Sequence, residues 1–328
     1  MTHKLVLASR IYAEKAELLE KYLTTDWQVL TSDPNADPEG FQEVAGDADA
    51  IVAGHIACDL PRTSTLKLYQ VPFTGYDFLS PEILPAGCMA ANTYEHETAI
   101  AEYILLAMLE WQIGLRKIDR EFREKSFQGR GPAQSEVHGE VRDRTVGIIG
   151  YGHIGKEVAQ RARAFGMKVI GTTRTERPTP PELDWLGTEA DIERLLGESD
   201  FVVLCCPLND QTRGLMNRER FGQMKPDGVV INVARGAVID EDALWEALSE
   251  KRIGGAVIDV WYRYPRRDDP SPQPSKHPLQ TLDNIIMTPH NSGWTAEQID
   301  RRWRFVAANL DRLARGEALE NVLFEGTR

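Results

Sequence analysis

Short apolar runs and amphipathic segments alternate along the chain. Apolar strands are predicted at Lys4–Ala8, Ala50–Ala53 and Leu66–Val71, and the last two follow polar or turn residues. The first strand leads into Tyr12–Leu23, where leucines recur at helical spacing. Strands that alternate with helices in this way favour a parallel α/β sheet.

A second α/β series begins at Thr145. Its predicted strands read TVGIIG, KVIGT, DFVVLCC, GVVINV, GGAVIDV and NIIMT. Helices are predicted between several of them, including Ile154–Phe165 and Asp242–Glu250. Because the chain has 328 residues, two series of this kind suit two domains better than one.

A long helix is predicted between the two series, over Thr98–Phe127. It starts apolar and ends highly charged, which suits a bridge between domains or a dimer element. Gly129–Glu140 is predicted to be a loop, and Tyr262–His277 is a second loop with four prolines, at 265, 270, 272 and 274. The last helix is predicted over Ala296–Ala314.

The composition narrows the class of partners. The net charge of −12 and the isoelectric point of about 5.2 disfavour nucleic acid or a membrane surface as the main partner. No apolar run approaches the length of a membrane span, and the N-terminus lacks the features of a signal peptide. None of the four cysteines has CxxC spacing, so we expect reduced thiols in a cytoplasmic protein and no metal site.

The sequence GYGHIG, residues 150–155, follows a predicted strand and opens a predicted helix, the context that indicates dinucleotide binding. Gly150 permits a tight turn, Gly152 lets the backbone approach a pyrophosphate, and Gly155 lets the helix pack close to its strand. At the end of the next strand an acid would hold the ribose of NAD, but Thr173 and Arg174 stand there. A guanidinium can bind a 2′-phosphate, so the sequence favours NADP(H), with NAD(H) as the alternative.

At this point the chain resembles the D-2-hydroxyacid dehydrogenase family over nearly its whole length. The resemblance is carried by LKLYQVPFTGYD (66–77), AIAE (99–102), GYGHIG (150–155), PLNDQT (207–212), NVARG (232–236), GGAVIDV (254–260) and TPHNSG (288–293). It implies D-specific hydride transfer between the cofactor and a small 2-hydroxy or 2-oxo acid.

The resemblance also implies the architecture. Two Rossmann-like domains with doubly wound parallel sheets would enclose a cleft. A discontinuous substrate domain would contain residues 1–97 and 296–328, and the inserted dinucleotide-binding domain would contain residues 98–295. Relatives of this kind are usually homodimers.

Two residues match the family's catalytic positions. Arg235 corresponds to the arginine that holds the substrate carboxylate and polarises the reacting carbonyl, a task that suits a permanently charged fork. His290 corresponds to the family's proton donor and acceptor, a task that suits an imidazole because its ordinary pKa lies near working pH.

Further contacts follow from the same resemblance. Substrate contacts are implied for Phe73, Thr74, Gly75, His96 and Ser292. Cofactor contacts are implied for Gly150, Gly152, His153, Ile154, Gly155, Thr173, Arg174, Cys206, Pro207, Thr212, Val233, Ala234, Asp259 and Gly293. His96 could equally cap the helix that follows it or lie exposed.

The chain departs from the family at one catalytic position. Most members carry a glutamate there that pairs with the histidine, whereas this chain has Tyr264. A phenol can orient the imidazole but supplies no negative charge, so we expect a less readily protonated His290. Arg263 and Glu241 remain alternative partners for the histidine.

Two other functions stay open. The stretch DVWYRYP also resembles formate dehydrogenases, and phosphite dehydrogenases are a third relative, so the substrate could be another small anion. His96 and Thr74 depart from the substrate-binding residues of those two groups. Proteins of this fold also act as nicotinamide-cofactor sensors without turnover, but a sensor has no need of both Arg235 and His290.

Overall fold

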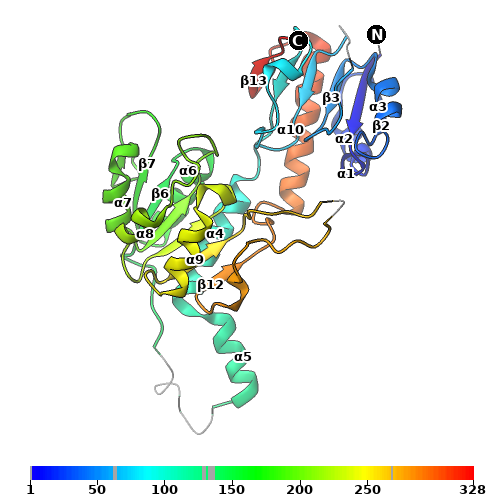
Figure 1. Cartoon of the computed structure of the whole chain (residues 1–328). Helices are drawn as coiled ribbons and strands as arrows, with labels where there is room; N and C mark the ends of the chain where they lie inside the picture. Colours follow the sequence, from blue (N-terminus) through cyan, green and yellow to red (C-terminus); the bar gives the residue numbers. More distant parts are fainter. Residues whose placement is uncertain (1, 62–64, 128–130, 132–136, 267–268) are drawn as a thin grey trace. The chain divides into compact units, whose positions relative to one another are not determined.

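The chain folds into two compact units (Figure 1). The computed structural model describes residues 2–61, 65–127, 131, 137–266 and 269–328. Unit 1 comprises Met1–His96 and Trp294–Arg328, and unit 2 comprises Glu97–Gly293. Each unit is an α/β structure on a largely parallel sheet, which confirms the predicted fold class. The predicted loop at Gly129–Glu140 lies mostly outside the described residues.

Unit 1 is built on a six-stranded sheet with the order β13-β5-β4-β3-β1-β2. Its strands are β1 (His3–Ala8), β2 (Trp27–Ser32), β3 (Ala50–Val52), β4 (Leu68–Gln70), β5 (Met89–Ala91) and β13 (Val322–Glu325). Its α-helices are α1 (Arg10–Ala13), α2 (Ala16–Tyr22), α3 (Pro38–Ala45) and α10 (Ala296–Arg315). The edge strand β13 runs antiparallel to β5, while the other pairs are parallel.

Helices cover both faces of the unit 1 sheet because its strands are apolar on both sides. In β1, Leu5 and Leu7 pack with residues of α2 and α10, whereas Val6 and Ala8 pack with residues of α3 on the opposite face. This division follows the two-residue period of side chains along a strand. It explains why the first strand reads as a continuous apolar run.

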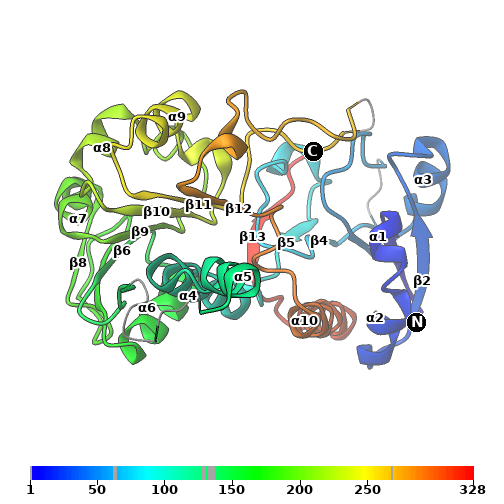
Figure 2. The same ribbon diagram turned by 90° about the horizontal axis from the view of Figure 1, so that it is seen from below.

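Unit 2 contains a seven-stranded parallel sheet with the order β12-β11-β10-β9-β6-β7-β8. Its strands are β6 (Thr145–Ile149), β7 (Lys168–Thr172), β8 (Trp185–Gly187), β9 (Phe201–Leu204), β10 (Val229–Asn232), β11 (Gly255–Ile258) and β12 (Ile285–Met287). Its α-helices are α4 (Glu97–Ile113), α5 (Leu115–Lys125), α6 (His153–Ala164), α7 (Ile192–Glu198), α8 (Arg218–Gln223) and α9 (Glu241–Ser249). Figure 2 shows α4 and α6 on one side of this sheet and α7, α8 and α9 on the other.

Two predicted helices are each divided in the structure. The helix expected over Thr98–Phe127 breaks at Gly114, whose φ of 66° is left-handed, and α4 and α5 meet there at a bend of 49°. The segment Tyr12–Leu23 contains the end of α1 and all of α2, separated by a turn at Glu14 and Lys15. Neither predicted helix is therefore continuous, because apolar spacing does not register a break of one or two residues.

Among the described residues, no single helix is both long enough and apolar enough to cross a membrane. The bent pair α4 and α5 meets the criteria of length and composition only when the two helices are taken together. The buried residues of α4 belong to the hydrophobic core of unit 2.

Candidate active site

The glycine-rich turn of unit 2 joins β6 to α6 at the carboxyl edge of the sheet. Gly150 has a φ of 97°, and a β-carbon there would lie 2.6 Å from the backbone nitrogen of Cys206. Cys206 follows β9, the strand next to β6 at the point where the strand order reverses. Open α/β sheets bind their ligands at this point.

The other two glycines of the turn differ in their surroundings. A β-carbon at Gly152 would meet no atom within 4 Å, so this side of the turn is open to a ligand. A β-carbon at Gly155 would lie 3.1 Å from the Gly150 carbonyl oxygen, which shows how closely α6 packs on the turn. His153 and Ile154 form the first turn of α6, where helical N–H groups favour phosphate.

A second loop lies beside this turn, at residues 205–212. The Thr212 hydroxyl donates a hydrogen bond to the Pro207 carbonyl at 2.6 Å and accepts one from the Asn209 N–H at 2.8 Å. Cys206 is buried, whereas Pro207 is exposed. The Thr212 side chain therefore stabilises the conformation of the loop.

The residues expected to select the cofactor follow β7. The Thr173 N–H donates to the Gly187 carbonyl, and Arg174 is exposed. Within the described part of the chain, no carboxylate lies within ion-pair distance of Arg174. Arg177, in contrast, covers the Tyr151 ring at 5.3 Å and donates to the Tyr151 carbonyl, so it braces the glycine-rich turn.

Arg235 follows β10 in a turn that a buried asparagine holds. The Asn232 side chain accepts a hydrogen bond from the Ala234 N–H and donates one to the Arg235 carbonyl, both at 3.0 Å. The Arg235 guanidinium is partly exposed and donates to the Ala234 carbonyl at 2.9 Å. A β-carbon at Gly236 would collide with the Trp261 carbonyl oxygen, which explains the glycine after the arginine. Val233 and Ala234 are buried in the turn.

His290 contacts the residue that replaces the expected acid. The hydroxyl oxygen of Tyr264 lies 2.8 Å from His290 Nδ1, and the Trp261 N–H donates to the same oxygen at 3.0 Å. Because a backbone amide can only donate, the phenolic proton is available to Nδ1. We infer that neutral His290 carries its proton on Nε2, and that protonated His290 donates from Nδ1 to the phenol.

Asp259 holds the loop on which His290 lies. It is fully buried, and its carboxylate accepts hydrogen bonds from the Thr288 hydroxyl at 2.6 Å and from the N–H groups of Asn291 and Ser292 at 3.0 Å. His290 itself has a φ of 60°, in the left-handed region. The sequence indicated Asp259 only through its strand and the family; the structure shows that it fixes the backbone around the histidine.

The surroundings of His290 lower its pKa. Desolvation by the atoms packed around the ring is the main cause, Asp259 raises the pKa, and the positive charge of Arg235 lowers it. Desolvation by the surrounding atoms raises the pKa of Tyr264 overall, while Arg235 lowers it. Arg235, Asp259, Tyr264 and His290 therefore form one electrostatic cluster within unit 2.

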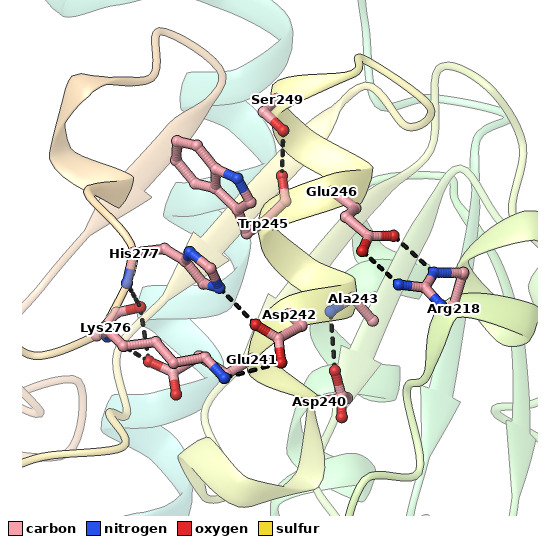
Figure 3. Close-up of polar contacts among 11 residues, drawn as sticks. Arg218, Asp240, Glu241, Asp242, Ala243, Trp245, Glu246, Ser249, Lys276 and His277 are labelled. Carbon is pink, nitrogen blue, oxygen red and sulfur yellow. Dashed lines mark hydrogen bonds and ion pairs between the residues drawn. The ribbon is translucent and has the colours of Figure 1, made fainter.

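The alternative partners of His290 are engaged elsewhere (Figure 3). Glu241, in the first turn of α9, accepts hydrogen bonds from the Ser275 hydroxyl and the Lys276 N–H. Asp242 binds Lys276 and His277, which lower its pKa, and the His277 ring stacks on Trp245 at 5.3 Å. These contacts attach the end of the proline-rich loop to α9.

The exposed Arg263 makes a backbone contact in the same loop, from its N–H to the Pro274 carbonyl. Of the three residues considered beside His290, the structure brings only Tyr264 into contact with it.

The predicted substrate loop lies in unit 1. The Asn92 amide donates to the Thr74 carbonyl at 2.9 Å, and the Thr93 N–H donates to the Phe73 carbonyl. The Thr74 hydroxyl lies 3.2 Å from both ring nitrogens of His96, so these two predicted residues are in contact. In the described chain, the N–H groups of residues 73–76, which include Gly75, donate no hydrogen bond and remain available to an anion.

Comparisons with known proteins agree with this geometry. The family model described as "D-isomer specific 2-hydroxyacid dehydrogenase, NAD binding domain" matches residues 105–292. A glyoxylate reductase of Thermococcus litoralis is 31% identical, over 98% of this chain and 97% of the relative. A D-3-phosphoglycerate dehydrogenase of Methanocaldococcus jannaschii is 40% identical over 62% of this chain, which spans only 36% of that relative.

A solved structure shows the same architecture. It is a D-isomer specific 2-hydroxyacid dehydrogenase family protein from Aeromonas salmonicida, with 25% identity and a TM-score of 0.76 over 98% of this chain and 99% of the other. The resemblance noted in the sequence is thereby confirmed. The chain belongs to the D-isomer specific 2-hydroxyacid dehydrogenase family.

Proposed function

We propose that this chain reduces a small 2-oxo acid to the D-2-hydroxy acid with NADPH. The observation that carries the proposal is that His290, which can donate a proton, lies close enough to Arg235 for the guanidinium to lower its pKa. When bound, the nicotinamide cofactor supplies the hydride. His290 gives a proton to the carbonyl oxygen, and Arg235 stabilises the negative charge that develops there.

Unit 2 is assigned as the dinucleotide-binding domain and unit 1 as the substrate domain. The residues fit a dinucleotide because Gly152 leaves open space where a pyrophosphate would meet the first turn of α6. In unit 1, the unused N–H groups of residues 73–76 would hold the substrate carboxylate. Val233, Ala234 and Gly293 would line the cofactor, whereas Asp259, Ser292 and Thr212 would act by positioning the loops around it.

The cofactor preference rests on Arg174. It is an exposed cation without an acidic partner in the described chain, at the position that meets the 2′ substituent of the ribose. Arg174→Glu should weaken NADPH binding by about 10- to 100-fold and improve the relative affinity for NADH. Lys251→Glu, the same charge change at another exposed site, should leave the preference unchanged. A preference unmoved by the Arg174 variant would refute this assignment.

Turnover is tested by NADPH absorbance with glyoxylate, hydroxypyruvate, pyruvate and bulkier 2-oxo acids. Consumption with one or more of them supports the proposed reductase. Tight NADPH binding with no turnover would instead support a sensor. Chiral analysis of the product would test D-specificity.

A second candidate function is oxidation of a small anion such as formate or phosphite. The neutral Tyr264 beside His290 favours it, because formate oxidation needs no proton donor. Reduction of NAD(P)+ by formate or phosphite, without turnover of any 2-oxo acid, would support this candidate.

We also propose that the chain forms a homodimer through α5. This helix extends away from the rest of unit 2 (Figure 1). Leu115, Ile118 and Phe122 lie on one stripe of it and are 63%, 44% and 50% exposed, and Phe127 beyond its end is also exposed. A second copy of the chain would cover this apolar stripe.

A further inference from the structure

Helix α10 of unit 1 carries buried polar groups that have no hydrogen-bond partner. Gln298 is fully buried, and both the oxygen and the nitrogen of its side-chain amide lack a partner. The buried Nε of Arg302, one helical turn later, also lacks one. Among the described residues, no carboxylate lies within ion-pair distance of Arg302.

Buried polar groups without partners lower the stability of the folded chain. A buried amide or cation that has lost water without gaining a partner destabilises the folded chain. The Trp294 ring partly offsets the cost of burying the Arg302 cation, because the guanidinium carbon lies over the ring at 5.4 Å from its centroid. Burial lowers the pKa of Arg302 to about 10, so the side chain stays charged at neutral pH.

A third polar group lies nearby. Tyr12 of α1 is close enough to Arg302 for each to shift the pKa of the other, although burial raises the pKa of Tyr12 to about 12. A β-carbon at Gly54, just after β3, would lie 2.9 Å from both the Tyr12 hydroxyl oxygen and the Phe73 ring. Through Tyr12, the cluster of Tyr12, Gln298 and Arg302 therefore adjoins Phe73 of the proposed substrate loop.

The donors of this cluster suit a carboxylate. A guanidinium offers paired N–H groups in the geometry of a carboxylate, and an amide nitrogen and a phenol add two neutral donors. We propose that Tyr12, Gln298 and Arg302 bind a second carboxylate, at the far end of the substrate, and that the preferred substrates are dicarboxylic 2-oxo acids. This inference rests on the proposed reductase function.

The test compares matched substrates in NADPH oxidation. Oxaloacetate, 2-oxoglutarate and 2-oxoadipate are paired with 2-oxobutyrate, 2-oxovalerate and 2-oxohexanoate, and hydroxypyruvate serves as a neutral polar substrate. At least one diacid should exceed its apolar partner in kcat/KM. Arg302→Met should lower kcat/KM for that diacid about 100-fold and for the monoacid less than threefold. Arg304→Met, an exposed change on the same helix, should leave both values unchanged.

The outcomes separate this inference from the function on which it rests. Turnover of monoacids or hydroxypyruvate in preference to every diacid would overturn the second carboxylate site and leave the reductase intact. An equal loss for both substrate classes in Arg302→Met would also overturn the site, because a structural role affects them alike. No turnover with any 2-oxo acid would refute the reductase itself.

A stability measurement tests the same site without turnover. Gln298→Leu removes two unpartnered polar atoms at nearly constant volume, so Tm without substrate should rise by roughly 2–4 °C. The same variant should lose selectivity for the diacid. A lower Tm together with unchanged selectivity would show that the amide is bonded within the fold and would refute its role in binding.

Discussion

At the scale of single residues, His290, the proposed proton donor, depends on two neighbours with different tasks. Asp259 fixes the backbone of its loop through three hydrogen bonds, and Tyr264 orients its ring through one. The aspartate thus supplies geometry, while the phenol sets the proton position on the imidazole. Neither task requires a carboxylate in contact with the ring.

Asp259→Asn should destabilise unit 2. The Asn291 N–H donates to one carboxylate oxygen and the Ser292 N–H to the other, so the amide nitrogen of the variant would face one of these donors and could not accept from it. We therefore expect a loss of about 2–4 kcal/mol in the free energy of unfolding. Urea denaturation measures this value. Asp283→Asn, at an exposed surface position, is the matched control and should unfold like the wild type. Equal stability of the two variants would show that the buried hydrogen bonds do not hold the loop.

The pH dependence of reduction should follow His290. Reduction needs the protonated imidazole, and desolvation by the surrounding atoms lowers the pKa of His290, so kcat/KM should fall as pH rises through a value below the ordinary histidine pKa. Tyr264→Glu places a negative charge beside Nδ1 and should raise the pH at which kcat/KM falls by about one unit or more.

The control for this prediction is Tyr264→Phe. This variant removes the hydrogen bond without adding charge. Its kcat/KM should be lower, and the pH at which kcat/KM falls should stay below the ordinary histidine pKa. A pH profile that is the same in wild type and Tyr264→Glu would show that the pair does not govern the proton.

At the scale of elements, the glycines in the turn between β6 and α6 are needed for different reasons. Gly150→Ala would force a left-handed residue against Cys206 and should destabilise the protein as well as weaken cofactor binding. Gly152→Ala meets no protein atom, so it should keep Tm within about 1 °C of wild type while weakening NADPH binding at least tenfold. Thermal unfolding and fluorescence titration with NADPH measure both, and unchanged NADPH affinity in Gly152→Ala would contradict the proposed phosphate site.

Sequence patterns predicted elements best where a buried strand is apolar throughout. The runs at β1, β6, β9 and β10 lie close to their predicted bounds because parallel strands are covered on both faces. Patterns failed at Gly114, where one left-handed residue divides α4 from α5 without changing the hydrophobic spacing. The short strands β5 and β8 were missed because neither contains valine, isoleucine or threonine, the β-branched residues that are typical of strands.

The same difference holds for the site. The glycine-rich turn is local, so its residues could be predicted from adjacent letters. The contacts of Asp259 with Asn291 and Ser292 join residues more than thirty positions apart, and only the paired ends of β11 and β12 bring them together. Resemblance indicated the positions of Arg235 and His290, but the attachment of Glu241 to the proline-rich loop required the structure.

At the scale of the whole molecule, the proposed homodimer depends on the apolar stripe of α5. Ile118→Asp combined with Phe122→Asp should convert dimers to monomers, because burying two carboxylates in an apolar interface costs several kcal/mol. Sedimentation velocity measures the change. Phe165→Asp, at another exposed phenylalanine of unit 2, should leave the dimer intact. A monomeric wild type, or a double variant that remains dimeric, would contradict the assignment.

The most direct test of the proposed chemistry is kcat/KM for 2-oxo acid reduction in wild type and Arg235→Met, with the NADPH dissociation constant measured in parallel. If Arg235 binds the substrate carboxylate and stabilises charge on the carbonyl oxygen, the variant should lose about 1,000-fold or more in kcat/KM. Its affinity for NADPH should stay within about threefold of wild type, because binding of the dinucleotide depends on the glycine-rich turn. A wild type that turns over no 2-oxo acid, or a variant as active as the wild type, would contradict the proposed mechanism.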